Sequence, residues 1–366
     1  MILMNDFTAE PEEMHSRMLV AARRVIDSGW YVLGKECQAF EREWSEECGA
    51  RHGIGVGNGM DAIEIALRAL GVGPGDEVIT TSMTAFATVL AILRTGAQAV
   101  LADIEPDTAL LSLASVERSI SPKTKAVVLV HLYGHIRDPK AWVDFCAGAG
   151  VALIEDCAQA HLAAVGERRA GNFGRVGAFS FYPTKNLGAV GDGGMIVTDD
   201  DDVAARCRML RNYGQSERYH HTLLGLNSRL DEIHAAMLRE KMEWLEAFTR
   251  RRRSIADEYR SGISNPAVSL LAAPRESSAH VYHLFVIRTA QRPGLEAHLT
   301  AKGVQTLRHY PIPIHLQPPC SGVQRDPAGL PCSEEHARVC LSLPCHPQMA
   351  DDDVRRVIDA VNSFGG

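Results

Sequence analysis

The sequence is poor in lysine and carries no excess of positive charge. Only seven of its 38 basic residues are lysines, and 45 acidic residues give a formal net charge of -7. Proteins that bind nucleic acid usually present a basic surface, so no such partner is expected. No apolar run reaches the roughly 20 residues that cross a bilayer, and the first residues do not resemble a secretion signal. We therefore expect a cytoplasmic protein without a membrane partner.

The nine cysteines lack the spacing of a disulfide framework. None of them forms a C-x-x-C pair, and their number is odd. Reduced thiols in the cytoplasm are the simplest interpretation. The segments with polar motifs contain no cluster of metal ligands. The sequence thus predicts no metal site.

Apolar segments of strand length alternate with helix-length segments between about residues 50 and 200. This alternation indicates βαβ units and a mainly parallel sheet with helices on its faces, which is an α/β fold. The expected strands are 54–56, 77–81, 98–101, 126–132, 151–154, 177–181 and 195–198, and the clearest helices are 61–70, 85–95 and 139–147. Two domains are expected from the length.

A long helix over about 229–261, with Asn227 or Ser228 as its natural N-cap, is expected to lead into a second domain. The later chain has a strand pattern at 281–288 and helix patterns at 294–302 and after Asp351. We place the large domain, with an N-terminal helical segment, at 1–248 and a small α+β domain at 249–366.

Lys185 is the most informative residue, because it follows an apolar, aromatic strand and precedes a glycine-rich turn. An amine held among aromatic groups loses hydration, so its pKa falls and the free amine becomes a nucleophile. A solvated surface lysine is the ordinary alternative. Its setting nevertheless makes Lys185 the first candidate catalytic residue.

Three further polar segments are expected at strand ends or helix starts, where open α/β sheets bind their ligands. The first of them is a glycine-rich turn that opens a helix, which favours an anion such as phosphate. Each segment alone could be a structural turn or a helix cap. The candidates are Gly59 and Met60 in segment 55–61, Asp156, Gln159 and His161 in segment 154–161, and Asn227 in segment 225–232.

One cofactor would use all four segments. Pyridoxal phosphate needs an amine that forms an imine, an anion near its pyridine nitrogen, a donor to its phenolic oxygen and a cradle for its phosphate. The chain offers, in that order, Lys185, Asp156, Gln159 or His161, and the Gly59 turn with Ser180. We therefore predict a pyridoxal phosphate enzyme in which Lys185 and Asp156 are catalytic.

Three motifs, at 155–161, 179–185 and 227–232, resemble those of the DegT/DnrJ/StrS family of sugar nucleotide aminotransferases. The resemblance covers nearly the whole chain and implies the fold type I architecture of pyridoxal phosphate aminotransferases. It also implies a homodimer with shared active sites. By residue, it assigns the imine to Lys185, the pyridine nitrogen to Asp156, the phenolic oxygen to Gln159, the phosphate to Gly59, the backbone of Met60 and Ser180, and the partner's phosphate to Asn227.

Two positions depart from the family pattern. Met60 stands where threonine or serine is usual, so a hydroxyl contact to phosphate is missing while the backbone N–H remains. Loss of one neutral hydrogen bond costs roughly 0.5–1.5 kcal/mol, or about tenfold in affinity at most. Ala85 stands where many members place an aromatic residue against the cofactor ring, and Phe86 follows it.

The resemblance implies ping-pong transamination from an amino acid, L-glutamate, to a nucleotide-linked keto sugar. Segments 282–286 and 306–317 resemble the members that act at C3 of dTDP-3-keto-6-deoxyhexoses. The candidates for the sugar and diphosphate pocket are Tyr182, His220, His309 and Tyr310, with ordinary packing as the alternative for each. Amination at C4 and an aminocyclitol aminotransferase are the competing activities. A dehydratase of this fold would have histidine at Lys185, and a non-catalytic sensor would not be expected to keep Lys185 and Asp156 together.

Overall fold

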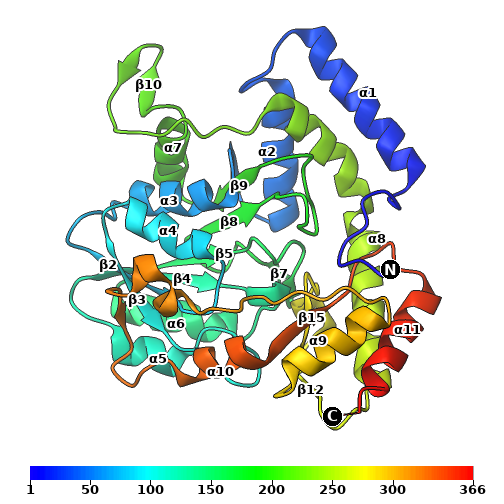
Figure 1. Ribbon diagram of the computed structural model, residues 1–366. Coiled ribbons are helices and arrows are strands. Elements are labelled where there is room, and N and C mark those ends of the chain that lie inside the picture. Colours follow the sequence, from blue (N-terminus) through cyan, green and yellow to red (C-terminus); the bar gives the residue numbers. More distant parts are fainter. Residues whose placement is uncertain (366) are drawn as a thin grey trace.

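The structure, a computed structural model, describes residues 1–365 and is built around one eight-stranded sheet (Figure 1). The strand order is β1-β9-β8-β5-β4-β2-β3-β14. Six neighbouring strands from β8 to β14 are parallel, and β9 runs antiparallel to both β1 and β8. Their bounds are β1 His52–Val56, β2 Glu77–Thr81, β3 Gln98–Ala102, β4 Thr124–Val130, β5 Ala152–Asp156, β8 Val176–Ser180, β9 Gly194–Thr198 and β14 Gln324–Arg325. The predicted α/β fold with a mainly parallel sheet is confirmed.

Helices cover both faces of this sheet because successive strand residues point to opposite sides. In β5, Ile154 packs under α3 (Gly59–Ala69), α4 (Phe86–Arg94) and α7 (Asp201–Leu210). Its neighbour Leu153 packs against α5 (Leu113–Ser119) and α6 (Pro139–Ala149) on the other face. Near β8 and β9 that second face is covered by α2 (Lys35–Cys48) and α8 (Glu232–Gly262). The strand ends between these layers carry the polar motifs.

The C-terminal part has a core of its own, formed by a three-stranded sheet and two helices packed on α8. The sheet contains β12 (Ser269–Leu270), β13 (Phe285–Arg288) and β15 (Cys340–Leu343), and the two helices are α9 (Arg292–Ala301) and α11 (Asp351–Asn362). A third helix, α10 (Pro331–Val339), packs outside this core through Ala337. The two parts are in contact: Ile2 packs in the C-terminal core, and β14 joins the large sheet. The boundary at residue 248 falls inside α8 and stays a prediction.

The expected N-cap of the long helix is wrong. Asp231 occupies the N-cap of α8, and its side chain makes no capping hydrogen bond. Upstream, the backbone N–H of Ser228 donates to the Arg211 carbonyl, and Leu230 is buried in the core. The chain therefore stays extended through residues 227–231, and the helix begins only at Glu232.

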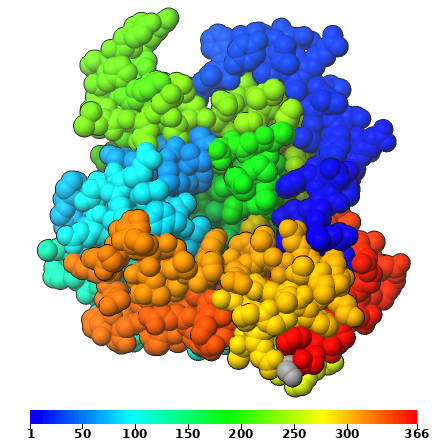
Figure 2. All heavy atoms as spheres, viewed as in Figure 1, coloured from blue at the N-terminus to red at the C-terminus, as the bar shows by residue number. Residues whose placement is uncertain are grey.

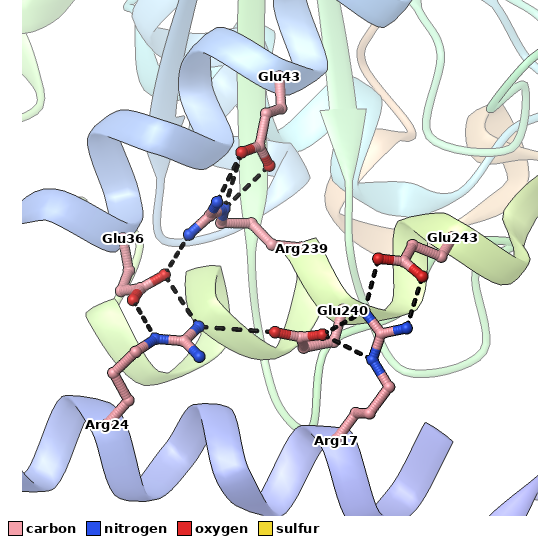
Figure 3. A network of polar contacts seen from close by, with 7 residues as sticks. All are labelled: Arg17, Arg24, Glu36, Glu43, Arg239, Glu240 and Glu243. Atoms are coloured by element: carbon pink, nitrogen blue, oxygen red, sulfur yellow. Dashed lines mark hydrogen bonds and ion pairs between the residues drawn. The ribbon is translucent and has the colours of Figure 1, made fainter. Parts of the chain in front are cut away.

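The N-terminal helix α1 (Glu12–Ser28) is held to α2 and α8 by a polar network, which Figure 3 shows in close-up. Arg17 of α1 binds Glu240 and Glu243 of α8, while Arg239 of α8 binds Glu43 of α2. Arg24 and Glu36 complete the network. Beneath it lies a small apolar contact of Ala21, Val25 and Ala236.

The remaining elements are short connections. The hairpin strands β10 (Gln215–Glu217) and β11 (His220–His221) form a projection that Figures 1 and 2 show standing apart from α1. The others are β6 (Ala164–Val165), β7 (Arg168–Arg169) and the 3-10 turns η1 Leu132–Gly134, η2 Ser277–Ala279, η3 Ile314–Leu316 and η4 Pro318–Cys320. All nine cysteines are free. Within residues 1–365, the helices are too short or too polar to cross a membrane.

Candidate active site

Lys185 lies in the turn that connects β8 to β9, and its backbone N–H donates to the Tyr182 carbonyl at 2.8 Å. Burial lowers the pKa of its amine from 10.5 to about 8, although the nearby charge of Asp156 acts in the opposite direction. The residues that the structure describes, 1–365, supply neither a hydrogen bond nor an ion pair to this amine. Lys185 is thus an unpaired amine whose pKa lies well below that of a solvated lysine, which raises its neutral fraction near neutral pH.

Asp156 ends β5 as a buried carboxylate with both oxygens held. Its Oδ1 accepts the Ala158 N–H at 3.1 Å, and its Oδ2 accepts the Thr88 hydroxyl at 2.8 Å. The Thr88 proton is committed to Asp156, so the hydroxyl of Thr84, 2.9 Å away, must donate to Thr88. These contacts fix the carboxylate while leaving lone pairs free for a further donor.

The turn before α3 approaches Ser180 closely. A Cβ atom added at Gly59 would lie 2.6 Å from the Ser180 Cβ, so only glycine fits there. The Asn58 side chain accepts the Asp61 N–H at 2.8 Å and thereby caps the helix. The N–H groups of Gly59 and Met60 have no intrahelical acceptor, as is general in the first turn of a helix. This helix start therefore presents free donors beside the Ser180 hydroxyl, which suits a phosphate group.

Gln159 and His161 have different surroundings. The Gln159 Oε1 accepts the Tyr133 N–H at 2.6 Å, and its Nε2 donates to the Tyr310 hydroxyl at 3.3 Å. His161 is enclosed by aromatic rings, and within residues 1–365 neither of its ring nitrogens has a hydrogen-bond partner. Burial, with a contribution from Lys185, lowers the pKa of His161 to about 3. Of these two, only Gln159 makes hydrogen bonds with residues of the predicted site.

Two of the four predicted sugar-pocket residues belong to the same site. His309 Nδ1 lies 2.8 Å from the Ser342 hydroxyl, and burial with the Lys185 charge lowers its pKa to about 4. Burial and the charge of Asp156 raise the pKa of Tyr310 to about 12. Both side chains are therefore uncharged at neutral pH, beside an amine and a carboxylate.

The other predicted residues lie on exposed surface. Tyr182 is 52% exposed, two residues after Ser180. His220 is exposed on β11, where its ring Nδ1 lies 3.1 Å from the Ser216 hydroxyl. Asn227 is exposed and forms a β-bridge with Asn212. The contacts of residues 1–365 do not join His220 or Asn227 to the Lys185 site of the same chain.

Thr88 and Tyr133 are contacts that the sequence analysis missed. Thr88 had a detectable signal, because it is polar within the apolar helix α4 and lies one helical turn after Thr84. Tyr133 had no such signal in the sequence. It adopts a left-handed backbone conformation, φ 62° and ψ 2°, which tyrosine does not favour and which the sequence therefore does not predict.

A buried group of His131, Glu155 and Cys157 resembles a metal site, since its potential ligand atoms lie within 4.8 Å of one another. The carboxylate is already used: Glu155 pairs with His131 at 2.8 Å. Its other donors are the backbone N–H groups of Gly171, Phe173 and Gly174. The group therefore acts as an internal link between β5 and the loop before β8.

Residues 12–362 match the DegT/DnrJ/EryC1/StrS aminotransferase family. The chain belongs to this family. It is 45% identical to dTDP-3-amino-3,4,6-trideoxy-alpha-D-glucose transaminase of Streptomyces venezuelae, over 98% of this chain and 95% of that protein. It is 43% identical to dTDP-3-amino-3,6-dideoxy-alpha-D-galactopyranose transaminase of Aneurinibacillus thermoaerophilus, over 94% of each.

The family assignment extends to three dimensions. The crystal structure of S. venezuelae DesV in complex with a ketimine intermediate superposes with a TM-score of 0.95 at 45% identity, covering 99% of this chain and 97% of that one. The predicted family and the fold type I architecture are confirmed, and the protein is an aminotransferase. Aminotransferases of this family depend on pyridoxal phosphate.

Proposed function

We propose that the protein transfers an amino group from L-glutamate to the C3 keto group of a dTDP-linked 3-keto-6-deoxyhexose. The observation that carries the proposal is the unpaired Lys185 amine, with a pKa of about 8, beside the fixed carboxylate of Asp156. The choice of substrate is supported by the two relatives, whose names both place the amino group at C3 of a dTDP sugar. These names favour C3 over C4 and over a cyclitol ketone.

The arrangement of donors and acceptors fits pyridoxal phosphate. When bound, this cofactor supplies a carbonyl group for Lys185 and a ring that withdraws electrons from the reacting carbon. Asp156 would hold the pyridine nitrogen and Gln159 the phenolic oxygen. The N–H groups of Gly59 and Met60, with the Ser180 hydroxyl, would hold the phosphate. The close approach of Gly59 to Ser180 supports this assignment, because it brings both groups to one place.

Lys185 is the proton carrier in this proposal. Its Nζ removes the proton from the α-carbon of the amino acid and, in the second half-reaction, delivers a proton to C3 of the sugar. A base with a pKa of about 8 is well matched to such transfers near neutral pH. Neutral His309 and protonated Tyr310 can form hydrogen bonds to sugar hydroxyls without adding charge to the site.

We further propose a homodimer with shared active sites. Asn227 is exposed, and the β-bridge to Asn212 fixes its backbone, so it is free to reach the phosphate site of a second copy. Large apolar side chains are exposed in segments that hydrogen-bond to the chain on either side of Asn227, or that follow such a segment, and they would be covered in a dimer. They include Trp30, Tyr31, Tyr213, Tyr219 and Leu224. The nine free cysteines suit the reducing cytoplasm that we propose as its location.

The substrate is tested with purified enzyme, glutamate and three classes of acceptor: dTDP-3-keto sugars, dTDP-4-keto sugars and keto-inositol. We expect an amino sugar only from the 3-keto class. Lys185→Ala should lower turnover by more than about 10³-fold and remove the visible absorbance of the bound cofactor. Lys125→Ala, at an exposed lysine, is the matched control and should retain activity. Full activity of Lys185→Ala, or product from another class alone, would refute the proposal.

A further inference from the structure

Tyr133 holds a strained turn against the candidate site. It lies in η1 after β4, is only 1% exposed, and has φ 62° and ψ 2°. A bulky residue pays a free-energy cost for this conformation, and such strain concentrates at functional sites. The next residue, Gly134, has φ 90°, and a Cβ atom there would lie 2.5 Å from the Gln159 carbonyl oxygen. The turn is thus pressed against the backbone of Gln159.

The main chain of Tyr133 orients the Gln159 side chain. Its N–H donates to the Gln159 Oε1 at 2.6 Å, so the amide oxygen faces the turn. The Nε2 group must then face the other way, where it meets the Tyr310 hydroxyl at 3.3 Å. One backbone donor therefore decides which side of Gln159 is offered to the site.

The side chain of Tyr133 fixes a different segment. Its hydroxyl donates to the His309 carbonyl, and it also lies 2.9 Å from the His336 Nε2. Because a hydroxyl has one proton, the His336 Nε2–H is the donor in the second contact. Burial lowers the pKa of His336 to about 4 and holds that of Tyr133 well above its usual value, so both groups stay neutral. The hydroxyl thus links η1, helix α10 and the loop at residues 309–310.

We propose that Tyr133, supported by His336, is a positioning residue that sets the 309–310 loop against Gln159 and so shapes the sugar side of the pocket. This inference rests on the proposed function, in which His309 and Tyr310 contact the nucleotide-linked sugar. The backbone of Tyr133 serves Gln159, and its hydroxyl serves the loop. Removing the hydroxyl alone therefore separates the two roles.

Tyr133→Phe keeps the ring and the backbone N–H, and it deletes the contacts to His309 and His336. We expect the KM for the dTDP-3-keto sugar to rise about tenfold, the effect of losing the buried hydrogen bond that anchors the His309 carbonyl. The KM for glutamate, the rate of the glutamate half-reaction and the cofactor absorbance should stay within about twofold of wild type, because the Gln159 contact remains. Equal rises in KM for both substrates would overturn the proposal.

Two further sets of variants separate positioning from stability. Tyr259→Phe is the control, because it also removes a buried hydroxyl that donates to a backbone carbonyl. This hydroxyl lies in the core of the C-terminal part and donates to the Pro344 carbonyl at 2.7 Å. This variant should lower the Tm and leave the sugar KM unchanged; a matching rise in KM there would refute a specific role for Tyr133. His336→Gln retains an N–H donor and should keep the KM low, whereas His336→Leu should reproduce Tyr133→Phe.

Hydrogen exchange gives a readout that needs no substrate. In the holoenzyme, Tyr133→Phe should speed exchange in peptides covering 307–313 and leave those covering 157–163 unchanged, since only the loop loses its anchor. Unchanged exchange at 307–313 would overturn the inference. If the wild-type enzyme aminates none of the 3-keto sugars, the proposed function fails, and the exchange result still decides the role of Tyr133.

Discussion

Lys185 differs from the other lysines in what surrounds its amine. Lys140, for example, is exposed on α6 and pairs with Asp144, whereas Lys185 has only the nearby charge of Asp156. Burial penalises charge, which lowers the pKa of Lys185 to about 8 and that of His309 to about 4. At the residue scale, burial therefore keeps His309 neutral and brings the pKa of the Lys185 amine close to the neutral range.

Acetylation of the cofactor-free protein at trace reagent levels tests this environment. We expect labelling of Lys185 to rise with a midpoint near pH 8, because only the neutral amine reacts and burial favours that form. Mass spectrometry of the Lys185 peptide measures it, with Lys140 as internal control. Asp156→Asn should move the midpoint lower, since Asp156 raises this pKa. Parallel labelling of Lys185 and Lys140 would contradict the expectation.

The same shift has a consequence for stability. The folded-state pKa of Lys185 lies below the unfolded value of 10.5, so between about pH 8 and 10.5 the unfolded chain holds a proton that the folded chain does not. The free energy of unfolding of the cofactor-free protein, relative to Lys185→Met, should therefore rise with pH across that window.

At the scale of elements, segment 227–232 connects parts of the molecule. The Ser228 hydroxyl accepts the Gly57 N–H at 2.9 Å, at the turn that leads into the phosphate cradle. Glu232, the first residue of α8, is buried and accepts three backbone N–H groups at the start of α2. Those donors are Gly34 and Cys37 to Oε1, and Glu36 to Oε2. Glu232 thus caps helix α2, although the two are about 195 residues apart in sequence.

Glu232→Gln tests the cap. It replaces one acceptor oxygen by an amide donor that faces N–H groups, and we expect the free energy of unfolding to fall by about 2 kcal/mol, within the range for bonds to a charged group. Urea unfolding measures the change. Glu243→Gln, on the same helix but 59% exposed and paired with Arg17, should cost less than about 1 kcal/mol. Equal losses in both variants would argue against a capping role.

At the scale of the whole molecule, some of the predicted site residues lie away from the Lys185 site of their own chain. Lys185, Asp156, Gln159, His309 and Tyr310 are interconnected by hydrogen bonds or by charge. Both His220, in strand β11 of the projecting hairpin, and Asn227, which forms a β-bridge with Asn212, lie on exposed surface. A second copy that contributes these residues is the arrangement that the proposed homodimer requires.

Mixed dimers test this sharing. We expect the Lys185→Ala and Asn227→Ala variants each to have low aminotransferase activity. Asn227→Ala loses a contact to a charged phosphate, which is worth about tenfold or more in cofactor affinity. In a mixed dimer, one site would combine an intact Lys185 with an intact Asn227 from the other chain. Co-purified, differently tagged chains should thus regain activity at one of the two sites. Without recovery, Asn227 does not serve the partner's site.

The sequence by itself determined the layered α/β fold and the residues at its strand ends. Strand and helix patterns are local, because alternating and helical spacing of apolar residues decide which face is buried. Asp156 could therefore be placed at the end of β5, and Lys185 in the turn that follows β8, before any contact was known. Thr88 was also within reach, since its spacing from Thr84 is helical.

Only the tertiary structure decided which groups meet. It enclosed His161 in aromatic rings, moved the N-cap of α8 to Asp231, and joined β14 to the large sheet beyond the expected domain boundary. It also gave Tyr133 a left-handed conformation that its residue type does not favour. These outcomes depend on contacts between different elements of the chain, and the contacts of Tyr133 also offset the strain of its backbone. No local pattern of residues encodes such contacts.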